Sequence, residues 1–278
     1  MNNFTERVLT SVLFVIVLLG AIMQSNFAAA ILFFVMIWLC QREFYNFFRP
    51  TDIKPLKLFG ILGGLGFFTI SALVTQADLQ LTSFYFLIPI IFMIFVLELY
   101  RNRPQPIPNI AFTILGIIYI AVPITLLHEL AFFSPYRFGE SYHFEPLMAY
   151  FFVLWANDTG AYLVGRKLGK RKLFPRISPK KTWEGTLGGV VFGLIVSYLN
   201  ALLFPLYAWW MWMCMGMIII LFGSWGDLVE SLFKRSLNIK DSGKLLPGHG
   251  GVLDRFDGIF ISAPMVYFFL RIMSLLNP

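Results

Sequence analysis

Long apolar runs separated by short polar breaks make up most of the chain. Runs such as VLTSVLFVIVLLGAIM and WWMWMCMGMIIILFG contain no charged residue. An α-helix needs about 20 mostly apolar residues to cross the hydrocarbon core of a bilayer. The pattern therefore predicts an all-α polytopic membrane protein with about nine transmembrane helices. Their expected ranges are 8–24, 27–46, 58–75, 84–100, 110–128, 147–166, 185–204, 207–223 and 257–274; the second is the least distinct, because it ends in the mixed sequence QREFYNFF.

The basic residues predict how these helices are oriented. If the N-terminus is cytoplasmic, 20 of the 22 Lys and Arg fall in links on the cytoplasmic side. The other side receives only Arg137 and Arg271. Cytoplasmic links of membrane proteins are enriched in Lys and Arg. We therefore expect a cytoplasmic N-terminus, an external C-terminus, and cytoplasmic basic loops at 166–181 and 234–255.

Composition supports a membrane protein and argues against a nucleic-acid partner. Charged residues make up 13% of the chain, whereas soluble proteins carry about 25%. The net charge of +7 would suggest nucleic-acid binding in a soluble protein. In a membrane protein it instead fits cationic loops beside anionic lipid headgroups.

The two halves of the chain differ in polar content. Residues 1–146 contain five predicted helices with weakly polar links, so we expect this region to act as a scaffold and to form dimer or lipid contacts. Residues 147–278 contain four predicted helices, the two largest basic loops and five of the seven aspartates. A catalytic site is therefore expected in 147–278, at the cytoplasmic interface.

The first polar cluster, NDTGAYLVGRKLGKRK, places Asp158 inside an apolar run. A carboxylate within a membrane helix costs about 2.5–3.5 kcal/mol on insertion scales and usually has a function. On a helix, Asp158 shares a face with Tyr162 and Gly165. The alternative is a structural carboxylate that is hydrogen-bonded inside the helix bundle.

The second cluster, FPRISPKKTWEGTLGG, precedes the seventh predicted helix. Ser178, followed by proline, indicates a turn, and Thr182 suits the N-cap of that helix. Lys180 and Lys181 then lie at a helix N-terminus, where backbone N–H groups favour anions such as phosphate. Alternatively, these lysines are ordinary topology signals and Glu184 is an ordinary first-turn acid.

The third cluster extends from Gly223 to Gly258 and begins with a polar stripe. On a helix, Asp227, Glu230, Ser231 and Lys234 occupy one continuous face. Membrane insertion does not require such a stripe, because acidic residues contribute little to topology. A solvated loop would explain the lysines of this cluster but not its aspartates.

The same cluster continues through a turn-rich stretch, Pro247–Gly251, whose backbone could approach a ligand closely. Asp254 and Asp257 follow at i and i+3 around Arg255, and we expect both on one face of the next helix start. Carboxylates without cysteine suit Mg²⁺ rather than zinc. His249 is expected to be structural or to contact phosphate.

Together, the three clusters predict a reaction class. Carboxylates beside many cations at a membrane face indicate a phosphorylated substrate, because phosphoryl and nucleotidyl transfer depend on neutralising oxyanions. The apolar helices could accommodate the tails of a lipid substrate. The residues thus predict a metal-dependent transferase that joins a water-soluble phosphate donor to a lipid, and they leave the donor open.

The last cluster resembles a known family signature. The pattern is Ser231-x-Phe233-Lys234-Arg235, then Lys240-Asp241, then Pro247-x-His249-Gly250-Gly251-x-x-Asp254-Arg255-x-Asp257. It is similar to the signature of the phosphatidate cytidylyltransferases, the CDP-diacylglycerol synthases, and shows no departure at the fixed positions. DTGAYLVG and SPKKTWEG also resemble family motifs, so the resemblance covers residues 157–258.

This resemblance implies that CTP and phosphatidate react to give CDP-diacylglycerol and pyrophosphate. It also implies Mg²⁺, with K⁺ as an expected second cation, and a homodimer in the bilayer of the inner (cytoplasmic) membrane. The expected catalytic residues are Asp227, Lys234, Asp254 and Asp257, of which the three aspartates are the expected metal ligands. The expected substrate- and nucleotide-binding residues are Asp158, Ser178, Lys180, Lys181, Thr182, Glu184, Ser231, Arg235, Lys240, Asp241, His249, Gly250, Gly251 and Arg255.

Two other classes remain alternatives. A CTP-dependent polyisoprenoid or lipid kinase could share the carboxylate pattern, but it would transfer the γ-phosphate and release CDP. A membrane transporter would place polar residues near the middle of the bilayer in both halves, whereas here they gather in one half. A CDP-alcohol phosphotransferase is disfavoured, because the sequence lacks a DGxxAR stretch.

Overall fold

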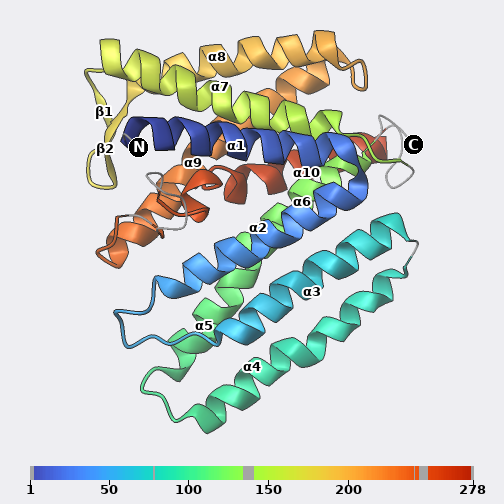
Figure 1. Ribbon diagram of the computed structural model, residues 1–278, viewed down its shortest axis with the longest axis vertical. Helices are drawn as coiled ribbons and strands as arrows, with labels where there is room; N and C mark the ends of the chain where they lie inside the picture. The colour runs from blue at the N-terminus through green and yellow to red at the C-terminus, as the bar shows by residue number, and fades with distance from the viewer. Residues whose placement is uncertain (1–2, 78, 134–140, 241, 244–249, 277–278) are drawn as a thin grey trace. The chain divides into compact units, whose positions relative to one another are not determined.

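Helices form most of the computed structural model, which describes residues 3–77, 79–133, 141–240, 242–243 and 250–276 (Figure 1). A 3₁₀ segment (Leu81–Leu87) precedes α4, and a π segment (Ile117–Ala121) joins α5 to α6. The helices are α1 (Asn3–Gln24), α2 (Asn26–Asn46), α3 (Lys57–Gln76), α4 (Ile88–Arg101), α5 (Pro106–Gly116), α6 (Val122–Glu129), α7 (Glu145–Leu168), α8 (Trp183–Leu203), α9 (Trp209–Ser236) and α10 (Ile259–Leu276).

Each predicted range coincides with one helix or with consecutive helical segments. Within the described residues, seven of these segments are long and apolar enough to cross a membrane. They are α2, α3, α4 with its 3₁₀ segment, the α5–α6 segment, α8, α9 and α10. The apolar part of α1 is shorter, at Leu9–Gln24, and α7 is not among the seven. The chain is therefore an all-α, multi-pass membrane protein.

Helix α9 differs from its predicted range. The apolar pattern predicts an end at residue 223, but the helix continues to Ser236. The additional turns carry Asp227, Ser231 and Lys234, so the polar stripe is helical as predicted. An amphipathic continuation after an apolar run does not end a helix, because its backbone hydrogen bonds are unaffected.

The structure also contains a small β-hairpin that the apolar pattern does not predict. Strand β1 (Lys172–Phe174) pairs antiparallel with β2 (Ser178–Thr182), with Lys172 opposite Thr182. The turn expected at Ser178 lies instead at residues 175–177, and Ser178 begins β2. The hairpin stands immediately before α8.

The chain divides into two compact units. One comprises Met1–Glu129 with Ser236–Phe256, and the other comprises Leu130–Arg235 with Asp257–Pro278. This division differs from the predicted boundary at residue 146. Of the described residues in Ser236–Phe256, Ser242 and Leu253 hydrogen-bond to Glu43 of α2, in the N-terminal unit.

In the N-terminal unit, α2 is the central helix. It contacts α1, α3, α5 and α6. Phe33, Ile37 and Phe44 are buried in this core. The side chain of Gln41 donates hydrogen bonds to backbone oxygens of α3 and α5, at 3.1 Å each. Gln41 thus joins α2 to both α3 and α5.

In the second unit, α7 and α8 form the most extensive helix pair of the described residues and run side by side in Figure 1. Glycines permit this close approach. A Cβ at Gly160 would lie 2.8 Å from the carbonyl oxygen of Gly188. A Cβ at Gly185 would lie 2.8 Å from the carbonyl oxygen of Ala161. Contact between the two backbones brings the β-hairpin, at the start of α8, beside the polar face of α7.

Candidate functional site

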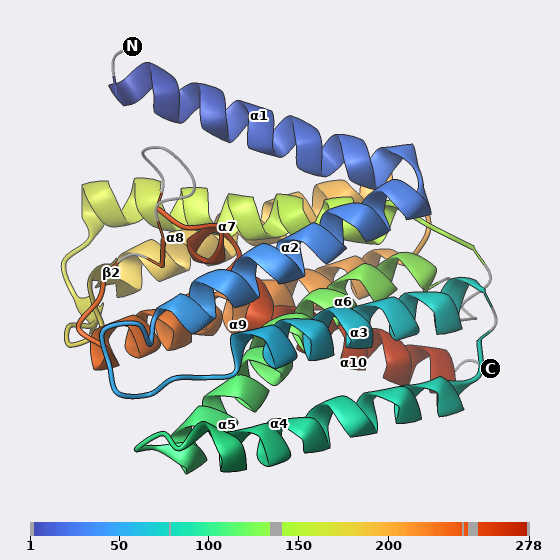
Figure 2. The same cartoon turned by 60° about the horizontal axis from the view of Figure 1, so that its bottom comes forward.

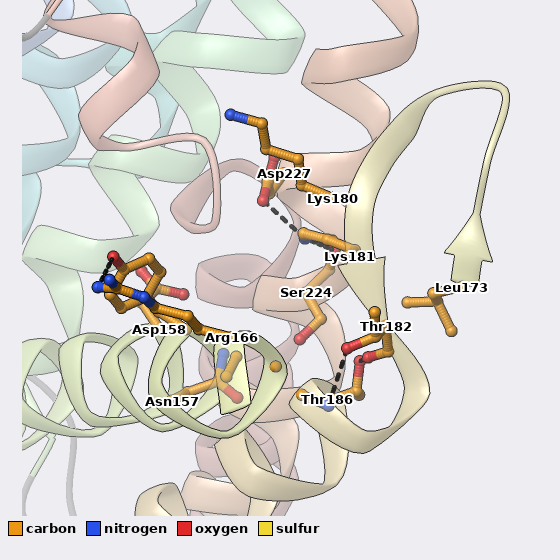
Figure 3. Close-up of a pocket in the computed structure, with 14 residues that line it drawn as sticks. Asn157, Asp158, Arg166, Leu173, Lys180, Lys181, Thr182, Thr186, Ser224 and Asp227 are labelled. Atoms are coloured by element: carbon orange, nitrogen blue, oxygen red, sulfur yellow. Dashed lines mark hydrogen bonds and ion pairs between the residues drawn. The ribbon is translucent and has the colours of Figure 1, made fainter. Parts of the chain in front are cut away.

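A cleft of about 410 Å³ lies in the second unit, between α7, the β-hairpin and the polar part of α9 (Figure 3). Residues from all three predicted polar clusters meet in it. They are Asn157, Asp158, Ala161, Tyr162, Gly165 and Arg166 from α7, Leu173, Lys180, Lys181 and Thr182 from the hairpin, Gly185 and Thr186 from α8, and Ser224 and Asp227 from α9.

The start of α8 is fixed by two side chains. The hydroxyl of Thr182 accepts a hydrogen bond from the backbone N–H of Gly185 at 3.2 Å, which confirms the predicted N-cap. The carboxylate of Glu184 accepts hydrogen bonds from the backbone N–H groups of Lys170 and Arg171 at 3.0–3.2 Å. These contacts join the end of α7 to the start of α8 and hold the hairpin beside the cleft.

Lys181 connects the hairpin to α9. Its Nζ lies 2.6 Å from Oδ2 of Asp227 and donates to the backbone oxygen of Ser224 at 3.4 Å. The other oxygen of Asp227 accepts a hydrogen bond from the Ser231 hydroxyl at 3.2 Å. Figure 3 shows the ion pair, with Asp158 projecting from α7. The cleft thus contains a cation and carboxylates within reach of one ligand.

The predicted face of α7 is confirmed. Asp158, Tyr162 and Gly165 all line the cleft. The Tyr162 hydroxyl accepts a hydrogen bond from Arg166 at 3.2 Å. The α7 wall therefore presents both a carboxylate and a guanidinium.

Asp257 lies beside the α9 carboxylates. A Cβ at Gly226 would lie 2.5 Å from the backbone oxygen of Asp257, so the turn before α10 contacts α9 directly. Burial raises the pKa of Asp257 well above its ordinary value. The nearby carboxylates of Asp227, Glu230 and Asp158 raise this pKa further. A hydrogen bond donated by the backbone N–H of Gly258 to the Asp257 carboxylate lowers the pKa, but by less. Such crowding of negative charge favours a cation.

The donor chemistry fits Mg²⁺ bound in part by substrate. In the described parts of the chain, no three His, Cys, Asp or Glu side chains converge to hold a metal alone. Mg²⁺ commonly uses only one or two carboxylates, and substrate phosphates complete its coordination. Asp227 and Asp257 lie on adjacent elements, and the Asp227 carboxylate raises the pKa of Asp257, so the two suit that arrangement.

Lys234 has a buried partner. Its Nζ lies 3.0 Å from Oε1 of Glu230, one helical turn earlier. Glu230 is fully buried, and Lys234 is 8% exposed. Lys234 is not among the residues that line the cleft. Removing one partner of a buried ion pair is destabilising, so we expect Lys234 to matter for the stability of the fold.

Asp254 lies in the N-terminal unit and organises a loop there. Its carboxylate accepts hydrogen bonds from the backbone N–H groups of Ser242 at 3.0–3.2 Å and of Gly251 at 2.9 Å. The prediction that Asp254 and Asp257 share one helix face is wrong. Asp254 belongs to a 3₁₀ turn, Leu253–Arg255, and α10 begins only at Ile259. The two aspartates also belong to different compact units.

Glu43 of α2, in the N-terminal unit, is a buried carboxylate that the sequence patterns did not single out. It is 7% exposed. Its carboxylate accepts hydrogen bonds from the Ser242 hydroxyl at 3.1 Å and from the backbone N–H of Leu253 at 2.8 Å. An acidic residue at the end of an apolar run is the signal that could have identified it.

The remaining predicted residues occupy several environments. Gly250 has φ 82, a left-handed conformation that favours glycine. Gly251 is buried. Asp241 and His249 lie outside the described residues. Arg235, Lys240 and Arg255 are exposed.

Comparison with known proteins places this geometry in a family context. The model of the "Cytidylyltransferase family" matches residues 5–273. A "Phosphatidate cytidylyltransferase" of Staphylococcus saprophyticus is 34% identical over 94% of this chain and 96% of its own length. A protein of the same name from Bacillus subtilis is 32% identical over 99% of this chain and its own full length. Another, from Staphylococcus aureus, is 33% identical over 94% of this chain and 96% of its own length.

Proposed function

This chain belongs to the cytidylyltransferase family, and on that premise we propose that it transfers the cytidylyl group of CTP to phosphatidate. The products are CDP-diacylglycerol and pyrophosphate, and the lipid product is an intermediate of phospholipid biosynthesis. The observation that carries this proposal is the near full-length similarity to relatives named phosphatidate cytidylyltransferase.

The chemistry requires little from a general base. An oxygen of the phosphatidate phosphate attacks the α-phosphorus of CTP, and the bond to the β-phosphate oxygen breaks. That attacking oxygen is already ionised at neutral pH, since the second pKa of a phosphate monoester is about 6. Catalysis then depends mainly on positioning the reactants and neutralising the phosphates.

The cleft has cations for this task. Lys180, Lys181 and Arg166 line it from two walls. Lys181 forms an ion pair with Asp227 at 2.6 Å. A phosphate entering the cleft would compete for Lys181 and release Asp227 for a metal ion.

We propose that Mg²⁺ is held by Asp227 and Asp257 together with the phosphates of CTP. The bound ion would neutralise charge on the departing pyrophosphate. Asp254, the third predicted ligand, hydrogen-bonds to loop backbone, so we assign it primarily to organising that loop. The resemblance further suggests K⁺ as a second cation.

We further propose that all nine helical segments span the inner membrane, with the N-terminus cytoplasmic, and that residues 1–146 contribute to a homodimer. The 20 to 2 division of Lys and Arg supports this orientation. A cysteine introduced at Lys172 should resist an impermeant thiol reagent in intact cells and react after lysis. Labelling in intact cells would overturn the orientation.

A product assay tests the proposed reaction. Purified protein is incubated with phosphatidate, Mg²⁺ and CTP labelled at either the α- or the γ-phosphorus. The proposal expects α-label in a lipid product and γ-label in pyrophosphate. Transfer of γ-label to a lipid with release of CDP would instead identify a lipid kinase.

A further inference from the structure

A second polar pocket lies within the N-terminal unit. The α2–α3 and α4–α5 links lie at the same end of its helices (Figure 2) and border a pocket of about 280 Å³. Tyr45 and Phe48 line it together with Ile53 and Pro55. We call this pocket the basic pocket, because five cationic residues line it: Arg49, Lys54, Lys57, Arg101 and Arg103.

Buried side chains hold the backbone of this pocket in place. Asn109, fully buried, accepts a hydrogen bond from the backbone N–H of Lys54 at 2.5 Å. Thr113, also fully buried, accepts one from the backbone N–H of Leu56 at 2.8 Å. Arg101 donates to the backbone oxygen of Lys54 at 2.8 Å. The positions of the cations are therefore set by the helix core, and such preorganisation lowers the cost of binding a ligand.

The charge in the pocket is only partly compensated. Arg101 pairs with the buried Glu98 at 2.6 Å, and Glu98 also accepts a hydrogen bond from Asn109 at 2.5 Å. In contrast, the two lysines donate hydrogen bonds to neutral oxygens. Lys54 donates to the backbone oxygen of Arg49, and Lys57 donates to the side-chain oxygen of Asn46. Positive charge therefore remains available to an anion.

The helix geometry adds to this positive potential. Helix α3 begins at Lys57, and its N-cap residue, Leu56, makes no side-chain capping bond. The N-terminus of a helix attracts anions through its N–H groups and its dipole. The end of α3 and the lysine and arginine side chains thus favour the same kind of ligand.

Two residues close in sequence to the lining residues have exposed apolar side chains. Leu58, next to Lys57, is 65% exposed, and Leu99, shortly before Arg101, is 78% exposed. These side chains belong to membrane-spanning helices, where acyl chains would cover them. A ligand with a phosphate and acyl chains could contact both surfaces.

We propose that the basic pocket binds the phosphate group of an anionic phospholipid. Basic pockets at the cytoplasmic ends of membrane helices are suited to such headgroups. The pocket lies in the N-terminal unit, whereas the cleft lies in the other unit, and the proposal does not depend on nucleotidyl transfer. The competing explanation is that these residues only set topology.

The experiment compares two triple variants with the same loss of charge. The pocket variant carries Arg49→Gln, Lys57→Gln and Arg103→Gln. It removes three pocket cations but retains the Arg101–Glu98 pair. The control variant carries Lys167→Gln, Lys172→Gln and Arg176→Gln. It removes three exposed cations that do not line the pocket. Binding to purified protein in detergent is measured by native mass spectrometry with phosphatidylglycerol. Phosphatidylcholine with the same acyl chains is the uncharged comparator.

We expect the pocket variant to bind phosphatidylglycerol about a hundredfold more weakly, since each cation near an anionic lipid strengthens binding about fivefold. The control variant should lose less than about threefold, and phosphatidylcholine binding should not change. Equal losses in both variants, or none in the pocket variant, would overturn the proposal.

Two further measurements complete the test. Inorganic phosphate is added as a competitor, and displacement of the lipid at equal concentration would identify a soluble phosphate as the ligand of the same pocket. If the triple variant does not fold, the single variant Arg103→Glu tests the proposal instead. Arg103 is exposed, so we expect this variant to fold. This reversal should weaken phosphatidylglycerol binding more than about tenfold, and unchanged binding would overturn the proposal.

Discussion

Replacement of Lys181 by glutamine tests whether the cleft neutralises transferring phosphates. The Lys181–Asp227 pair is 2.6 Å long, but its side chains are 27% and 36% exposed. Partly exposed ion pairs contribute about 0–1 kcal/mol to stability. Lys181→Gln should therefore remain folded, with a melting temperature within a few degrees of the wild-type value.

The effect on catalysis should be larger. A side chain that stabilises negative charge in the transition state accounts for about 1.4–4 kcal/mol. We expect Lys181→Gln to lower kcat/KM for CTP by about ten- to a thousandfold. The assay follows label from the α-phosphorus of CTP into lipid at saturating phosphatidate, with thermal melting measured on the same preparations.

Lys172→Gln is the matched control. Lys172 belongs to the same hairpin and is exposed, but it does not line the cleft. A topology role for these lysines predicts small and similar effects at both positions. Equal, mild losses in Lys181→Gln and Lys172→Gln would refute the reasoning and leave the carboxylate site untouched.

Three further predictions concern charged residues of the two units. Asp227→Asn and Asp257→Asn should abolish turnover rather than only raise the KM for CTP; a near-normal kcat at saturating Mg²⁺ would remove that residue from the ligands. Lys234→Gln should destabilise the protein by about 3–5 kcal/mol, because it removes the cation 3.0 Å from the buried Glu230 carboxylate; thermal melting should show that loss and its partial recovery with Glu230→Gln added. Glu43→Gln should cost about 1–3 kcal/mol through weakened acceptor bonds to the Ser236–Phe256 segment, and unaltered melting and hydrogen exchange of Leu253 would contradict that role.

Local sequence patterns account for much of the second unit. The apolar runs predicted the helices, and the i, i+3, i+4 spacing of Asp227, Glu230 and Ser231 predicted a stripe that α9 confirms. The residue type and position of Thr182 predict an N-cap, and the capping bond that confirms it, to Gly185, spans only three residues. Patterns of this kind depend on neighbouring residues, so the sequence contains them directly.

The role of Lys234 illustrates a limit of pattern reading. The stripe predicted that Lys234 lies one turn beyond Glu230, which is correct. Periodicity does not determine which face of α9 is packed. Because Lys234 pairs with the buried Glu230 while Lys181 lines the cleft, we expect Lys181 to be the lysine whose loss lowers catalysis at constant stability.

The sequence by itself determined the helical segments, the asymmetric distribution of charge and the family of this protein. Only the tertiary structure decided that Asp254 and Asp257 belong to different compact units and that Glu43 supports the Ser236–Phe256 segment. Glu43 and Leu253 are 210 residues apart, yet they form a hydrogen bond of 2.8 Å. Such a contact depends on how the apolar helices pack, because a buried carboxylate must find donors wherever the fold provides them.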